Sequence, residues 1–216
     1  CTPTLEKYQG YLVNCIFDVF ASRRFVDSHH VSLLEKKLEE RYSRHVVATA
    51  SGTAGLIMVL DSITDQKGEI IVPSLSFSAS IQSIVHSGNT PVFCDIDPSS
   101  WNIDPKEIRD NITKKTRAIL AVNLFGVPCK IKEIEEIGIK YGVPVIYDSC
   151  QAFGARHELG EVGTFGKAEV FSLDSTKIVS GGLGGFITTT DKELVEKLRL
   201  AKNFGNSTAR ETLQRG

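Results

Sequence analysis

Short apolar runs alternate with amphipathic segments along most of the chain. Seven of these runs predict strands, at residues 46–49, 70–72, 91–94, 118–122, 144–147, 170–173 and 186–190. Segments with apolar residues at helical spacing, such as 56–63 and 131–141, lie between most of the runs. Strands that alternate with helices are typical of right-handed crossovers and of a mostly parallel sheet with helices on both faces. The pattern therefore predicts an α/β protein with three layers, α/β/α, around a seven-stranded sheet.

Both ends of the chain depart from this alternation. Residues 5–21 and 29–43 have the apolar spacing of two helices, which precede the first strand. The glycine loop between the last two runs is too short for a crossover helix, so we expect residues 186–190 to pair antiparallel. Asp191 is placed to cap a final helix over residues 192–203.

Composition adds little to this picture, because it is ordinary for a soluble globular protein. The chain has 216 residues, of which 41% are hydrophobic and 24% are charged. A net charge of -1 gives no electrostatic reason to expect a nucleic acid or a membrane as a partner. No apolar stretch approaches the ~18 residues of a transmembrane helix, and the start does not resemble a signal peptide. We therefore expect a cytoplasmic protein.

The five cysteines are scattered and form no C-x-x-C pair. This spacing indicates neither a disulfide framework nor a zinc site, and we expect no metal. Cys94 and Cys150 lie in or beside apolar runs, where cysteine usually acts as a small core residue.

Chemistry is expected where the strands end, because ligands of open parallel sheets bind beyond the carboxyl ends of the strands. The first strand runs into Ser51, Gly52 and Thr53, which open a helix. Free N–H groups at a helix start bind phosphate well, although a plain Ser N-cap explains the same residues. The second strand leads to Phe77, which can stack on a ligand ring or pack in the core.

A carboxylate and a lysine follow two later strands. Asp148 comes directly after the fifth apolar run, where a partly desolvated carboxylate needs a cationic partner, or else it caps a helix. Lys177 lies between the sixth run and a glycine cluster. An amine in such partly apolar surroundings is a good nucleophile for a carbonyl carbon, whereas the alternative is a surface lysine in a turn. A phosphate-binding helix start, a stacking ring, a carboxylate and a lysine on successive strand ends together match the needs of pyridoxal 5'-phosphate (PLP).

At this point the sequence resembles the DegT-type sugar aminotransferases, a family within the fold type I PLP-dependent enzymes. The similar motifs lie at residues 50–54, 71–77, 90–97, 102–104, 116–119, 124–126, 148–152, 171–172 and 176–177. The resemblance implies a homodimer with shared active sites. It also implies a PLP-binding large domain at 46–205 that follows an N-terminal helical segment at 1–45. Residues 206–216 would begin the connection to a C-terminal domain, and the chain would then be a fragment of a longer protein.

The resemblance also implies a role for each site residue. Lys177 would be the Schiff-base lysine and would carry the proton that moves during transfer. Asp148 would contact the pyridine nitrogen, and Gln151 the ring oxygen. The cofactor phosphate would contact Gly52, Thr53 and Ser172. The cofactor ring would stack on Phe77.

The implied reaction moves an amino group, usually from glutamate, to a keto carbon of a nucleotide-linked sugar. Two positions depart from the family pattern. Leu183 replaces a common acidic residue, and Asn123 stands where histidine is common. Two alternatives to this reaction therefore stay open, namely another PLP reaction on a ketosugar, such as dehydration, and an inactive PLP-binding paralogue. The presence of Lys177 argues against a dehydratase, because the resemblance leads us to expect histidine at this position in the dehydratases.

Overall fold

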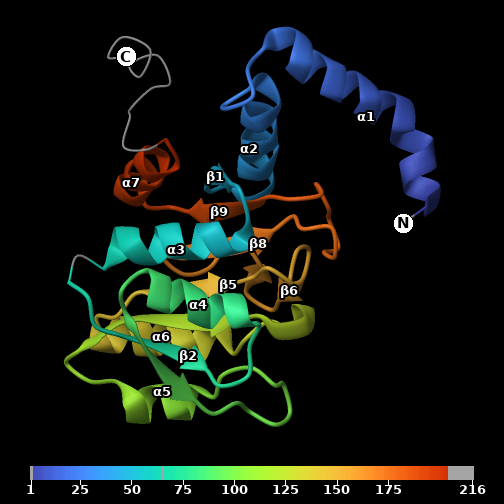
Figure 1. Cartoon of the computed structure of the whole chain (residues 1–216). Helices are drawn as coiled ribbons and strands as arrows, with labels where there is room; N and C mark the ends of the chain where they lie inside the picture. The colour runs from blue at the N-terminus through green and yellow to red at the C-terminus, as the bar shows by residue number, and fades with distance from the viewer. Residues whose placement is uncertain (1, 65, 204–216) are drawn as a thin grey trace, which may run out of the picture.

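The computed structural model describes residues 2–64 and 66–203, with side chains from residue 7 onward (Figure 1). Its main element is a seven-stranded sheet in the order β1-β9-β8-β5-β4-β2-β3. The strands are His45–Thr49 (β1), Glu69–Pro73 (β2), Thr90–Cys94 (β3), Thr116–Val122 (β4), Val145–Asp148 (β5), Ala168–Ser172 (β8) and Gly185–Thr189 (β9). Strands β3, β2, β4, β5 and β8 run parallel, and β9 pairs antiparallel with both β8 and β1. The seven predicted strands and the antiparallel last strand are confirmed.

Helices cover both faces of the sheet. Helices α3 (Gly52–Ile63), α4 (Ser78–His86) and α7 (Lys192–Lys202) pack on one face. Helices α5 (Pro105–Asn111), α6 (Ile131–Tyr141) and α2 (His29–Tyr42) pack on the other. The predicted three-layer α/β/α architecture is therefore confirmed.

Strand β4 shows why the central runs are apolar at every position. Ala118 and Leu120 point into the core under α3, α4 and α7, while Ile119 and Ala121 point into the core under α5 and α6. All four side chains are fully buried. A strand covered on both faces needs apolar residues on both, so the alternation typical of half-exposed strands disappears.

The beginnings and ends of three helices are each set by a single residue. The Ser51 hydroxyl accepts a hydrogen bond from the Ala54 N–H at 3.1 Å and begins α3, and Asp191 accepts one from the Leu194 N–H at 3.0 Å and begins α7. Gly142, at φ 66°, ends α6 in the left-handed conformation that favours glycine. The capping role predicted for Asp191 is confirmed, and α7 ends at Lys202.

Two features lie outside the sheet domain's main layers. A short hairpin, β6 (Arg156–His157) with β7 (Gly160–Glu161), was not predicted, because two-residue strands leave no periodic pattern. Helix α1 (Thr2–Ser22) reaches away from the sheet at the N-terminal end of the described chain (Figure 1). Across the described residues, none of the helices has the length and apolar character needed to cross a membrane. Residues 204–216, which include the predicted connecting segment, lie outside the described residues.

Candidate functional site

One cavity of about 390 Å³ lies at the carboxyl ends of the parallel strands. All seven residues predicted to bind the cofactor line it: Gly52, Thr53, Phe77, Asp148, Gln151, Ser172 and Lys177. They follow four different strands, so the sheet topology brings together residues that are up to 125 positions apart (177 minus 52). The strand-end rule of open α/β sheets selects five of these residues, and the family resemblance supplies Gln151 and Ser172.

The first turn of α3 forms one end of the cavity. Ser51 caps the helix as the plain N-cap explanation requires, and the N–H groups of the next residues have no acceptor within the helix. A Cβ atom on Gly52 would lie 2.6 Å from the Cys150 sulfur and 3.1 Å from the Ser172 Cβ. Glycine is therefore required here because β5 and β8 end directly against the helix start. Gly52, Thr53 and Ser172 all line the cavity, and a helix start of this kind attracts anions.

Asp148 lines the cavity and is only 6% exposed. Its Oδ2 accepts a hydrogen bond from the Ser80 hydroxyl at 2.7 Å, and its Oδ1 accepts one from the Cys150 N–H at 3.1 Å. Among the described residues both donors are neutral and no ion pair includes Asp148, so the cationic partner that the sequence predicts would come from a ligand. A buried carboxylate with neutral donors keeps its charge uncompensated. This arrangement suits a ligand that brings a positive charge, such as a protonated pyridine nitrogen.

Lys177 enters the cavity from the loop after β8. Its side chain is half-buried, and the Nζ atom lies 5.7 Å from the centroid of the Phe77 ring. The backbone turn before it is fixed by Asp174, whose Oδ1 accepts hydrogen bonds from the N–H and the hydroxyl of Thr176. These two bonds also hold the pKa of the Asp174 carboxyl below its usual range. The turn thus directs the lysine into the cavity, and not into solvent as a simple surface turn would.

Phe77 is 62% exposed and precedes α4. Packing of this residue in the core is therefore wrong. Phe77 lines the cavity, and its stacking on a ligand ring stays a prediction. Gln151 also lines the cavity, and its Oε1 accepts a hydrogen bond from the Phe125 N–H at 2.8 Å. Because the oxygen is engaged, the amide nitrogen of Gln151 remains available as a donor.

Two buried polar residues near this cavity, Ser80 and Glu169, carry little signal in the sequence. Ser80 gave no sequence signal beyond a hydroxyl in a helical segment. Glu169 is fully buried in β8, and its only sequence signal is a charged residue inside an otherwise apolar run. Burial raises the pKa of Glu169 to about 7, against opposing hydrogen bonds from Phe165, Ser149 and Gly163.

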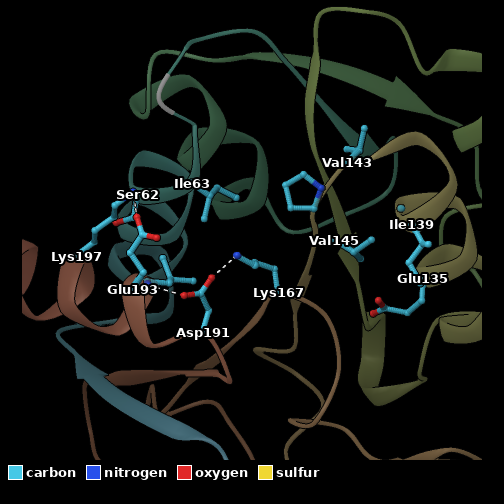
Figure 2. A pocket seen from close by; sticks show the side chains of 14 residues that line it. Ser62, Ile63, Glu135, Ile139, Val143, Val145, Lys167, Asp191, Glu193 and Lys197 are labelled. Carbon is cyan, nitrogen blue, oxygen red and sulfur yellow. Dashed lines mark hydrogen bonds and ion pairs between the residues drawn. The ribbon is translucent and has the colours of Figure 1, made fainter.

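Another cavity, of about 510 Å³, lies at the opposite ends of the strands, beside the start of β5 (Figure 2). Four of its five charged side chains form ion pairs with one another, Lys167 with Asp191 and Lys197 with Glu193. None of the seven predicted residues lines it. The predicted residues therefore lie at the cavity at the carboxyl ends.

The fold and the cavity together define a class of protein, the large domain of fold type I PLP-dependent aminotransferases. The structure superposes on DesI, which was crystallised in the presence of its TDP-sugar product, with a TM-score of 0.88 and 31% identity over 92% of this chain and 51% of that one. It superposes on NtdA from Bacillus subtilis with bound pyridoxamine phosphate with a TM-score of 0.82 and 30% identity, over 87% of this chain and 43% of that one.

Sequence comparison identifies the family. Residues 12–215 match the DegT/DnrJ/EryC1/StrS aminotransferase family, and the chain belongs to it. The chain is 38% identical to the dTDP-4-amino-4,6-dideoxy-D-glucose transaminase of Shigella dysenteriae, over 94% of this chain and 54% of that protein. The chain spans about half the length of the curated relatives it matches. The resemblance found in the sequence is confirmed.

Proposed function

We propose that this protein binds PLP and transfers an amino group, from glutamate, to a keto carbon of a nucleotide-linked sugar. The observation that carries the proposal is the convergence of Lys177, Asp148 and the α3 start on one cavity. The similarity to a dTDP-sugar transaminase and to DesI with a TDP-sugar product supports the class of acceptor. Glutamate as donor rests on the family resemblance.

Each cavity residue has a definite place in this proposal. The first turn of α3, with Gly52, Thr53 and Ser172, would hold the phosphate, and Phe77 would stack on the ring. When bound, the cofactor supplies a carbonyl that reacts with amines and a ring that takes up electron density. The Lys177 amine would hold the cofactor covalently and later carry a proton to and from the substrate carbon.

The remaining two residues would act on the ring itself. Asp148, whose described hydrogen-bond donors are neutral, would keep a proton on the ring nitrogen and so maintain the ring as an electron acceptor. The Gln151 amide nitrogen would donate to the ring oxygen, because its own oxygen is already bonded to Phe125.

The visible absorption spectrum of the protein with PLP tests this proposal. We expect a band that depends on Lys177 and that glutamate shifts, since glutamate would convert the bound cofactor to its amino form. Lys177→Ala should abolish both the band and transamination, because no other predicted site residue carries an amine. Lys192→Ala, which removes an exposed lysine at the start of α7, is the matched control and should leave both unchanged. A normal band in Lys177→Ala would refute the proposed role of this lysine.

A second candidate function is PLP binding without transamination. It is favoured by Leu183, which is 78% exposed in the loop after Lys177 and replaces the family's usual acidic residue. A band that requires Lys177 but does not respond to glutamate, glutamine or other amino donors would support this candidate over the first.

We further propose that the protein is a cytoplasmic homodimer with shared active sites. Helix α1 supports association, because Tyr11, Phe17 and Phe20 on it are mostly exposed, and exposed apolar surfaces of this kind mark interaction sites. Light scattering should give twice the mass of one chain, and Phe17→Glu should shift the mass toward the monomer. A monomeric wild-type protein would contradict this part of the proposal.

A further inference from the structure

A chain of buried hydrogen bonds runs from β8 to the wall of the cofactor cavity. The Glu169 Oε1 accepts hydrogen bonds from the Gly163 N–H at 2.8 Å and the Phe165 N–H at 2.6 Å. Its Oε2 accepts one from the Ser149 hydroxyl at 2.8 Å. The Ser149 oxygen in turn accepts from the Asn123 side-chain amide at 2.9 Å, and Asn123 lines the cavity. Glu169, Ser149 and Asn123 are all fully buried.

The same residues join the ends of three neighbouring strands. The Asn123 N–H donates to the Asp148 carbonyl at 3.0 Å, and the Ser149 N–H donates to the Val170 carbonyl at 2.8 Å. The Asn123 Oδ1 also accepts from the Cys129 N–H at 2.8 Å, which fixes which end of the amide faces Ser149. A substitution that breaks one of these hydrogen bonds therefore affects the backbone segment that carries Asp148.

The direction of each bond depends on a carboxylate at position 169. A hydroxyl has one proton to donate, and Ser149 donates it to Glu169 while accepting from Asn123. A glutamine side chain at position 169 would keep its oxygen toward Gly163 and Phe165, and its amide nitrogen would then face Ser149. Ser149 would lie between two N–H donors, and its own proton would have no acceptor.

We propose that Glu169 is a positioning residue of the cofactor site, which acts through Ser149 to hold the Asn123 amide and the Asp148 strand end in one arrangement. Glu169 itself does not line the cavity. This inference rests on the proposed function, because it concerns the cavity in which PLP would bind.

The test measures the dissociation constant of PLP by titrating the cofactor-free protein with PLP at pH 8 and recording the absorbance. Loss of one buried hydrogen bond predicts that Glu169→Gln weakens PLP binding by about fivefold to tenfold. Ser149→Ala should weaken it by a similar factor. In the Ser149→Ala background, Glu169→Gln should change the dissociation constant by less than about twofold, because the coupling passes through the hydroxyl.

Glu135→Gln is the matched control. Glu135 accepts a hydrogen bond from the Gly166 N–H at 2.9 Å and so anchors the same loop as Glu169, but it has no described hydrogen bond to Ser149. We expect wild-type affinity for this variant. Equal weakening in Glu135→Gln, or an undiminished effect of Glu169→Gln in the Ser149→Ala background, would show that Glu169 acts only by anchoring the loop and would overturn the inference.

Two further outcomes are distinguishable. If Glu169→Gln does not fold, as judged by circular dichroism, Ser149→Ala decides the question alone, and unchanged PLP affinity in it refutes the coupling. If wild-type protein shows no Lys177-dependent band with PLP, the proposed function fails and this inference fails with it. A normal wild-type band with unchanged affinity in both variants refutes only the positioning role.

Discussion

Gly52 offers the sharpest test of how the helix start and the strand ends fit together. An added methyl group at this position would lie 2.6 Å from the Cys150 sulfur and 3.1 Å from the Ser172 Cβ. Two effects of Gly52→Ala oppose each other. Alanine is favoured over glycine within a helix by roughly 0.5–1 kcal/mol, whereas overpacking of a close-packed site costs about 1–3 kcal/mol. Because the 2.6 Å contact is closer than real Cβ atoms tolerate, we expect the overpacking to dominate.

The expected result is a net loss of about 1–2 kcal/mol in the free energy of unfolding, measured by urea titration. Removing the sulfur should relieve most of the strain, so Gly52→Ala should cost at least about 1 kcal/mol less in a Cys150→Ala background than in wild type. Gly10→Ala is the control, because an added methyl group at Gly10 meets no atom within 4 Å. Additive effects of the Gly52 and Cys150 substitutions, or a more stable Gly52→Ala protein, would refute the argument from close contact.

Two other predictions concern buried carboxylates. Asp148→Asn should leave PLP bound but lower transamination turnover by orders of magnitude, since an unprotonated ring is a poor electron acceptor; near-normal steady-state rates would remove Asp148 from its role. Burial raises the pKa of Glu169 from 4.5 to about 7, so its contribution to stability is complete below pH 4.5 and is lost as the pH rises through 7. Glu169→Gln should therefore reduce the fall in unfolding free energy between pH 5 and pH 8 by up to about 3 kcal/mol; an identical pH slope in wild type and variant would contradict this pKa.

Sequence reasoning succeeded where a pattern extends over many residues. The apolar runs of the strands and the helical segment 131–141 depend on burial along a whole element, so a few unusual positions do not obscure them. The strand-end rule then placed five of the seven candidate residues at one edge of the sheet, and the family resemblance added Gln151 and Ser172. The short hairpin β6–β7 escaped prediction because its strands have only two residues each.

Individual side chains were harder to predict than elements. The sequence around Phe77 was compatible with a buried core residue and with a residue that lines a cavity. Only the path of the chain between β2 and α4 places the side chain at the cavity. The cationic partner expected for Asp148 stays a prediction, and its described hydrogen-bond donors are a hydroxyl from α4 and a backbone N–H. Ser80 lies 68 positions before Asp148, and nothing in the local sequence links the two residues.

The sequence alone determined the class of fold, the family, and which residues stand at the strand ends, because hydrophobic periodicity and motif spacing are local properties of the chain. The tertiary structure decided which polar groups bond to one another. The contact of Gly52 with Cys150, the bond from Ser80 to Asp148, and the chain from Glu169 to Asn123 each join separate elements. Their energies depend on distances of a few tenths of an ångström and on the direction of single protons, which are fixed only when the helices and strands are packed together.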